Sequence, residues 1–412
     1  MRFLFAVPPL AGHVNPTLAV AAELAARGHD TAWTGPPEVL AGLLPAHARL
    51  FPSGSAAEAA EAAEAAARAA GPGPSPVAGG YEALHGRWRD LRGVAALRFL
   101  WSQALLPLAR AMVPGVERAV RAYRPDVVVA DQQALAGPLA ARRLGVPWVT
   151  SATTSAEFTR PFADFPKVGE WVADQVAALV AEYGPPDQVP GGRGFDPRFS
   201  DRLVLVFSTP QLVGADEEFP AHFAFVGPAL GSRPPGGEFP WSRLDPDRRR
   251  VLVSLGTLNQ EAGSRFYARV LEAADRLADD VQLVLAAPAA LTGPVPEHVV
   301  LRDTVPQLDL LPHLDAVVSH GGHNTVCEAL AHGLPLVVAP IRDDQPIVAR
   351  QVAAAGAGVR LRFGRVRAED LTGALASVLD DPRYRRAARR IQTSFAAAGG
   401  AAAAADRLEK LT

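Results

Sequence analysis

One segment near the end of the chain, DAVVSHGGHNTVCEALAHGLPLVVAP at residues 315–340, limits the possible folds more than any other. Residues 316–318 are apolar and mostly β-branched, as in a strand that is buried on both faces. Two adjacent glycines then allow a tight turn, helical spacing follows, and Gly333 ends the helix. Residues 334–339 predict a second buried strand. A strand, a glycine loop, a helix and a strand in this order indicate a parallel sheet, in which ligands bind outside the carboxyl ends of the strands.

The same alternation of strands and helices occurs in both halves of the chain. In the first half, residues 2–7 predict a strand, 17–27 a helix, and 126–131 and 146–150 two further strands. The second half opens with the apolar run VLVSLGT at 251–257 and continues through further runs of this kind. Such alternation indicates parallel sheets that are covered by helices on both faces. The predicted fold class is therefore α/β, with two doubly wound, Rossmann-like domains that face each other across a cleft.

Domain boundaries follow from the composition between the two halves. Residues 208–247 include the run GPALGSRPPGGEFP, which is rich in proline and glycine and predicts a linker. We therefore expect an N-terminal domain at residues 1–207, the linker at 208–247, and a C-terminal domain at 248–412 whose last helix could pack back on the first domain. The sequence DPD at 245–247 is similar to a metal-binding Asp-x-Asp, but its place in the linker favours a turn or a helix cap.

Composition excludes several classes of function. The 412 residues are 49% hydrophobic and 20% charged, as in a globular protein, and the formal net charge of −2 gives no general attraction to nucleic acid. Cys327 is the only cysteine, so we expect no intrachain disulfide and a reducing, cytoplasmic location. The apolar run at the N-terminus is too short for a signal peptide, and no stretch reaches the roughly 20 apolar residues of a membrane span. We expect no stable membrane insertion.

An alanine-rich segment at residues 55–70 has high helix propensity, and the glycine- and proline-rich residues 71–80 cannot continue it. The favoured interpretation is a solvated surface helix followed by a loop. The alternative is a flexible wall or lid over a pocket.

Four short motifs together resemble a known family. GHVNP at residues 12–16, VPQLDLL at 305–311, SHGGHNTVCEAL at 319–330 and DDQ at 343–345 are similar to the family 1 glycosyltransferases of the GT-B fold. The resemblance is closest to the bacterial branch that glycosylates natural products such as macrolides. It covers nearly the whole chain, including FVGP at 225–228.

This resemblance implies a reaction and its substrates. The reaction is an inverting, metal-independent transfer of a sugar from a dTDP- or UDP-sugar to a hydroxyl of a small, lipophilic natural-product acceptor. No cofactor is implied, because the nucleotide sugar is a co-substrate, and a homodimer is compatible with the resemblance. Two rival functions stay open: another GT-B enzyme such as a nucleotide-sugar epimerase, and a non-catalytic binding partner that keeps the fold. Which sugar, base and acceptor are used is left undecided.

Residues of the glycine loop and its surroundings match the phosphate site of the family. The free N–H groups at the start of a helix favour an anion, typically a phosphate. The resemblance assigns the diphosphate contact to His320 and a second phosphate contact to Thr257. It assigns the remaining phosphate contacts to residues at the predicted helix start, which are Gly321, Gly322, Asn324 and Thr325.

The other parts of a nucleotide sugar match further positions of the second domain. The resemblance assigns the ribose hydroxyls to Glu328, which follows Asn324 by four residues and so shares its helix face. An acceptor-only carboxylate suits a vicinal diol. The sugar hydroxyls are assigned to Asp344 and Gln345. Val305 and Gln307 fall where the family contacts the base, next to Thr304, where the family often has Trp.

His13 and Asp131 match the catalytic pair of the family. His13 lies in the loop after the first predicted strand, where imidazole would serve as a general base near neutral pH. Asp131 ends the strand DVVVA and matches the carboxylate that orients the base and stabilises its cation. Alone, these residues would be taken for a turn histidine and a strand-end or cap aspartate. We interpret His323 as pocket lining and Cys327 as a small core residue.

The acceptor cannot be identified from the sequence. Its candidate binding residues are aromatic side chains of the first domain that could equally belong to the core: Trp88, Trp101, Phe158 and Phe162.

Overall fold

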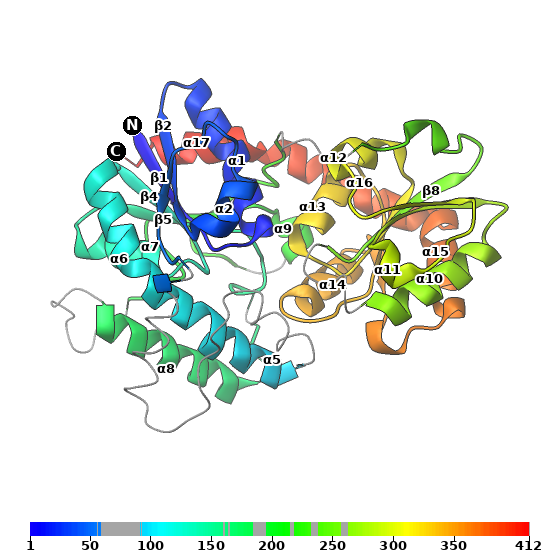
Figure 1. Ribbon diagram of the computed structural model, residues 1–412, viewed down its shortest axis with the longest axis horizontal. Helices are drawn as coiled ribbons and strands as arrows, with labels where there is room; N and C mark the ends of the chain where they lie inside the picture. The colour runs from blue at the N-terminus through cyan, green and yellow to red at the C-terminus, as the bar shows by residue number, and fades with distance from the viewer. Residues whose placement is uncertain are drawn as a thin grey trace.

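A computed structural model describes residues 1–55, 57–58, 91, 93–159, 161–163, 165–183, 195–214, 218–231, 238–256 and 263–411. These residues form two α/β domains, blue to green and green to orange in Figure 1. The predicted pair of doubly wound domains is confirmed. Of the predicted surface helix and loop at 55–80, only residues 55, 57 and 58 are among those described.

The first domain contains a seven-stranded sheet in which neighbouring strands run parallel in the order β3-β2-β1-β4-β5-β6-β7. Its strands are β1 (Arg2–Ala6), β2 (Asp30–Gly35), β3 (Leu50–Pro52), β4 (Val127–Asp131), β5 (Trp148–Ala152), β6 (Val204–Val206) and β7 (Phe223–Phe225). Its helices are α1 (Ala11–Ala26), α2 (Pro37–Leu43), α5 (Gly93–Phe99), the π-helix η1 (Leu100–Leu105), α6 (Leu106–Tyr123), α7 (Ala136–Arg143), α8 (Pro166–Tyr183) and α9 (Pro210–Val213).

The second domain contains a six-stranded parallel sheet of order β10-β9-β8-β11-β12-β13. Its strands are β8 (Arg249–Ser254), β9 (Val281–Ala286), β10 (Val299–Arg302), β11 (Ala316–Ser319), β12 (Leu336–Val338) and β13 (Gly358–Arg360). Its helical elements, preceded by η2 (Trp241–Arg243), are α10 (Ser264–Arg276), α11 (Ala289–Thr292), α12 (Gln307–Leu310), η4 (Leu311–His313), α13 (His323–Ala331), α14 (Gln345–Ala354), η5 (Phe363–Arg365), α15 (Ala368–Asp380) and α16 (Pro382–Ala398).

In both sheets the strand order reverses at one point, the switch point, where a doubly wound sheet forms a crevice. In each, the first strand of the domain lies in the middle and the order reverses next to it, between β1 and β4 and between β8 and β11. Loops leave these strand pairs in opposite directions, so a ligand site opens there. The strands are buried on both faces: Val127 and Val129 belong to one core cluster, and Val128 and Ala130 to the cluster on the other side.

The last helix, α17 (Gly400–Glu409), leaves the second domain and packs beside α1 of the first (Figure 1). Its buried Ala404, Ala405 and Leu408 join the core of the first domain. Arg27 at the end of α1 donates hydrogen bonds to the carboxylates of Asp406 at 2.6 Å and Glu409 at 2.8 Å. The chain thus crosses between the domains a second time.

The boundary of the first domain needs correction. β7 lies within the predicted linker and pairs with β6, so the first sheet continues to residue 225 rather than ending at 207. This strand has three residues and follows Pro220, which is too little alternation for a strand signal. Within the linker, Asp245 and Asp247 form a turn, in which the N–H of Asp247 donates to Asp245 Oδ1 at 2.9 Å. Among the described helices, none is long and apolar enough to cross a membrane.

Candidate active site

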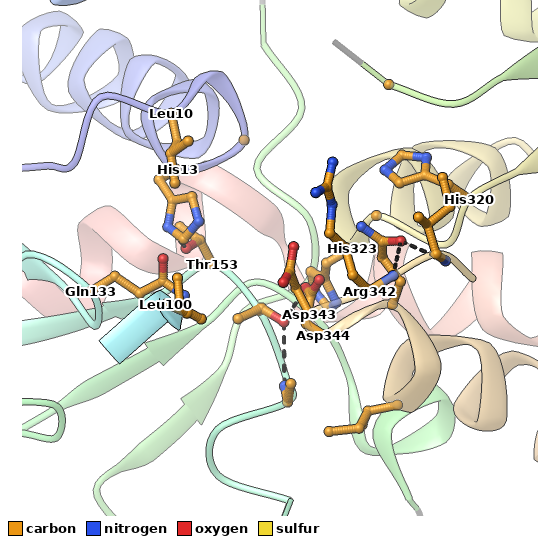
Figure 2. Close-up of a pocket in the computed structure, with 18 of the residues that line it drawn as sticks. Leu10, His13, Leu100, Gln133, Thr153, His320, His323, Arg342, Asp343 and Asp344 are labelled. Carbon is orange, nitrogen blue, oxygen red and sulfur yellow. Dashed lines mark hydrogen bonds between the residues drawn. The ribbon is translucent and has the colours of Figure 1, made fainter. Parts of the chain in front are cut away.

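A cavity of about 710 Å³ lies between the carboxyl ends of the two sheets and is lined by both domains (Figure 2). The first domain contributes the loops after β1, β4 and β5, together with α5, η1 and α6. The second contributes the loops after β8, β10, β11 and β12. Two switch points therefore face one shared space, as expected for two doubly wound domains.

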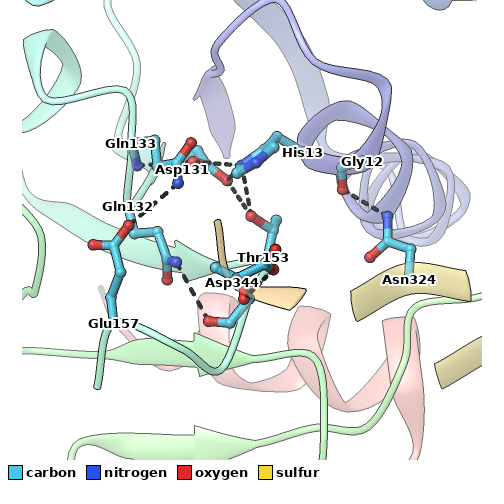
Figure 3. A network of polar contacts seen from close by, with 10 residues as sticks. Gly12, His13, Asp131, Gln132, Gln133, Thr153, Glu157, Asn324 and Asp344 are labelled. Carbon is cyan, nitrogen blue, oxygen red and sulfur yellow. Dashed lines mark hydrogen bonds and ion pairs between the residues drawn. The ribbon is translucent and has the colours of Figure 1, made fainter. Parts of the chain in front are cut away.

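His13, Asp131 and Thr153 form a hydrogen-bonded cluster on the first-domain side (Figure 3). His13 Nδ1 lies 3.0 Å from both carboxylate oxygens of Asp131 and 2.8 Å from the hydroxyl of Thr153. Thr153 in turn donates to Asp131 Oδ2 at 2.7 Å. Asp131 ends β4, Thr153 directly follows β5, and His13 lies in the first turn of α1, the helix that follows β1. This helix begins at Ala11 rather than at the predicted residue 17, so His13 is helical and not part of a loop. Because β1, β4 and β5 are neighbours in the sheet, the three residues meet although they are far apart in sequence.

This cluster sets the protonation of His13. Asp131 is fully buried, and the N–H of Gln133 donates to its Oδ1 at 2.8 Å. Because the carboxylate can only accept, the proton of a neutral His13 belongs on Nδ1, which leaves the lone pair on Nε2. Burial by itself lowers the pKa of His13, but the charge and hydrogen bond of Asp131 more than offset it, so the pKa is raised above its ordinary value of 6.5.

His320 on the second-domain side has the opposite environment. It directly follows β11, and its ring lies between two glycines: a Cβ on Gly256 would come within 2.7 Å of it and one on Gly322 within 2.6 Å. Burial lowers the pKa of His320 to about 4. It is therefore neutral at physiological pH and can offer a hydrogen bond, but no charge, to an anion.

The helix next to His320 begins directly after the glycine loop. α13 starts at His323, with Gly322 as the residue before its first turn, and neither Asn324 nor Thr325 caps it. Asn324 instead donates from its amide to the carbonyl of Gly12 at 2.6 Å, across the two domains (Figure 3). The N–H groups of a first helical turn have no partner within the helix, and Gly322, Asn324 and Thr325 at this turn line the cavity.

The residues matched to the ribose, the base and the sugar all reach this cavity. Gln307 donates to Glu328 Oε2 at 2.5 Å, so the residues matched to the base and to the ribose are in direct contact, and Val305 also lines the cavity. The amide oxygen of Gln345 accepts the backbone N–H groups of residues 341 and 342, at 2.9 and 3.0 Å, which leaves its NH₂ group for a ligand. Asp344 also lines the cavity.

Gly321 is not among the cavity-lining residues; its φ of +89° and the nearby Val338 side chain require a glycine in the turn. Thr257 and Trp88 lie outside the described residues.

The acceptor side of the cavity is mostly apolar. Trp101 and Phe162 line it, with side chains of α5, η1 and α6 around them. Phe158 is a correction: it does not line the cavity but packs edge-on against Phe219, Phe223 and Phe225. The strand β7 that supplies two of these rings was not predicted, so the core that Phe158 joins was not apparent.

Glu157 is a titratable group on this side that the sequence did not indicate. It lines the cavity, and the amide of Gln133 donates to its Oε1 at 3.3 Å. Burial raises the pKa of Glu157 to about 7. Of the two residues interpreted as non-catalytic, Cys327 is buried with a pKa raised by burial, and its Sγ lies 3.5 Å from His323 Nε2. His323 is buried at the edge of the cavity.

Comparisons with known proteins agree with this geometry. Residues 268–411 match the family model described as erythromycin biosynthesis protein CIII-like, C-terminal domain. Demethyllactenocin mycarosyltransferase of Streptomyces fradiae is 33% identical over 99% of this chain and 86% of its own length. The 4'-demethylrebeccamycin synthase of Lentzea aerocolonigenes is 28% identical over 100% of this chain and 99% of its own. The solved glycotransferase of kitacinnamycin superposes with a TM-score of 0.74 at 25% identity, covering 99% of this chain and 98% of that one.

Fold and similarity together define a class, the GT-B glycosyltransferases of natural-product biosynthesis. The chain belongs to this family and is a glycosyltransferase. The predicted family and enzyme class are thereby confirmed, in preference to an epimerase or a non-catalytic partner.

Proposed function

We propose that the protein transfers a sugar from a dTDP- or UDP-sugar to a hydroxyl of a small, lipophilic natural product, with inversion and with His13 as general base. The observation that carries the proposal is the placement of the His13 cluster and the start of α13 on opposite walls of one cavity. A base and a diphosphate site must face each other in this way for in-line displacement at the anomeric carbon.

The proposed step uses groups already described. His13 Nε2 takes the proton of the acceptor hydroxyl, whose oxygen attacks the anomeric carbon while the bond from that carbon to the diphosphate breaks. The nucleoside diphosphate leaves, and the imidazolium is stabilised by the Asp131 carboxylate at 3.0 Å. Thr153 accepts or donates nothing to the substrate in this scheme; its hydroxyl fixes Asp131 Oδ2.

On the donor side, the leaving diphosphate is stabilised by dipoles rather than by a metal. The N–H groups at the start of α13 and the neutral ring of His320 donate to it. Glu328 and Gln307 are placed for the ribose and base, and Asp344 with the NH₂ group of Gln345 for the sugar. The apolar wall around Trp101 and Phe162 supports a lipophilic acceptor.

The test is a transfer assay with UDP-glucose and dTDP-glucose, each in EDTA, against a panel of lipophilic phenols and alcohols. Mass spectrometry detects the glycoside, and the proton coupling of the anomeric centre gives its configuration. We expect a product of inverted configuration without added metal. Product that requires Mg²⁺, or that retains the donor configuration, would contradict the proposal.

A further inference from the structure

Three consecutive hydroxyl residues follow β5 and are almost fully buried: Thr153, Thr154 and Ser155 are 3%, 4% and 0% exposed. Buried hydroxyls need hydrogen-bond partners, and each of the three finds a different one. Thr153 holds the His13–Asp131 pair of its own domain. The other two bond to the opposite domain.

Thr154 donates to Oδ2 of Asp344 at 2.7 Å, and Ser155 donates to Oε1 of Gln351 at 2.7 Å. Gln351 lies in α14, the helix that Asp344 immediately precedes. One loop of the first domain is thus fixed to both the start and the middle of a single segment of the second. Figure 3 draws Thr153 of this loop and Asp344 of the second domain within one network of polar contacts.

The partner of Thr154 faces the cavity. Asp344 lies beside Arg342 and Asp343, across the space from His13 (Figure 2). A carboxylate can accept hydrogen bonds at both oxygens, so the bond to Oδ2 orients the group and leaves Oδ1 for another donor. Hydrogen bonds to a charged acceptor are also the stronger ones, which makes this bond well suited to fixing one rotamer.

Resting on the function proposed above, we propose that Thr154 is a positioning residue of the donor-sugar site: from the acceptor domain it orients Asp344 for the sugar, and its peptide bond to Thr153 links that orientation to the catalytic pair. The nucleotide is then held by the second domain alone, whereas correct binding of the sugar requires both domains. Losing Thr154 therefore affects the sugar and not the nucleotide.

The test compares Thr154→Val, which is isosteric but lacks the hydroxyl, with Thr154→Ser, which keeps it. Calorimetry measures the affinity for UDP-glucose and for UDP, or for the dTDP pair if that is the one bound. We expect Thr154→Val to weaken binding of the nucleotide sugar roughly ten-fold, from loss of a hydrogen bond to a charged group. Binding of the free nucleoside diphosphate stays within two-fold, and Thr154→Ser restores the wild-type values.

Ser155→Ala is the matched control, since it removes a neighbouring interdomain hydrogen bond that does not contact Asp344. We expect it to change both affinities by less than two-fold. Equal losses for nucleotide and nucleotide sugar in Thr154→Val, or no loss of either, would overturn the inference. Failure of the proposed function gives a different result, because the wild-type protein would then bind neither UDP nor dTDP.

Discussion

Two of the histidines that line the cavity, His13 and His320, both lie at the switch point of their domain, yet their environments differ. His13 follows the first strand of the first sheet and His320 the fourth strand of the second, so both lie at a switch point. His13 has a buried carboxylate at 3.0 Å, which raises its pKa above 6.5. His320 has glycines on both sides, and burial lowers its pKa to about 4. The same side chain is thus suited to accept a proton in one domain and to remain a neutral donor in the other.

The largest effect is expected from His13→Ala. It removes the proposed base, so transfer to an aliphatic alcohol should fall by roughly 10²–10⁴-fold. Nucleotide affinity should not change, because the phosphate site is in the other domain. Turnover and calorimetry on the same preparation check both statements. An acidic phenol should lose less than the alcohol, since it deprotonates with little help, and an equal loss for the two would argue against a base.

Asp131→Asn tests whether the Asp131 carboxylate is what distinguishes His13 from His320. The amide keeps the shape of the group but no longer stabilises an imidazolium, so the rate should fall by roughly 10–10²-fold, the worth of a hydrogen bond between charged groups. Thr153→Val should cost less, because Asp131 keeps its bonds to His13 and to the N–H of Gln133. Rate constants for the two variants, measured at saturating donor, show which substitution causes the larger loss. A larger loss in Thr153→Val would mean that the hydroxyl, and not the carboxylate, controls His13.

Gly322→Ala tests the glycine environment of His320. The backbone at Gly322, with φ −59° and ψ 132°, accepts alanine without strain, but the added Cβ would lie 2.6 Å from His320 Nε2. The ring must move, and affinity for the nucleoside diphosphate should fall about ten-fold, as for an overpacked site. Gly373→Ala in α15, where a Cβ meets nothing within 4 Å, is the control and should bind like the wild type. Unchanged affinity in Gly322→Ala would mean that His320 does not contact the phosphate.

The smallest expected effect concerns pH. Only neutral His13 can accept a proton, so the rate of sugar transfer should be maximal above the pKa of His13. The rate should fall as the pH decreases through that pKa, with an inflection above pH 6.5. Glu157, with a pKa of about 7, titrates in the same range and lines the same cavity. The acid limb of the pH–rate profile should therefore persist in Glu157→Gln. Its disappearance there would assign the limb to Glu157.

The sequence predicted the parts of this site that depend on periodicity and strand ends. Buried strands and glycine loops placed His13, Asp131 and His320 at carboxyl ends, where a doubly wound sheet binds ligands. It did not indicate Thr153 or Thr154, because hydroxyl residues are common in loops. Only the adjacency of β4 and β5 brings Thr153 to Asp131, and only the packing of the two domains brings Thr154 to Asp344. The role of Phe158 was missed for a similar reason, since two of its three aromatic partners belong to a three-residue strand.

The most direct test of the difference between the two histidines is a ¹⁵N NMR titration of histidine-labelled protein. Loss of a resonance pair in His13→Gln or His320→Gln assigns each ring, and the nitrogen shifts report both protonation and tautomer. We predict that His13 is an Nδ1–H tautomer that protonates with a pKa above 6.5, while His320 stays neutral down to about pH 4. A pKa for His320 that equals or exceeds that of His13 would contradict this account.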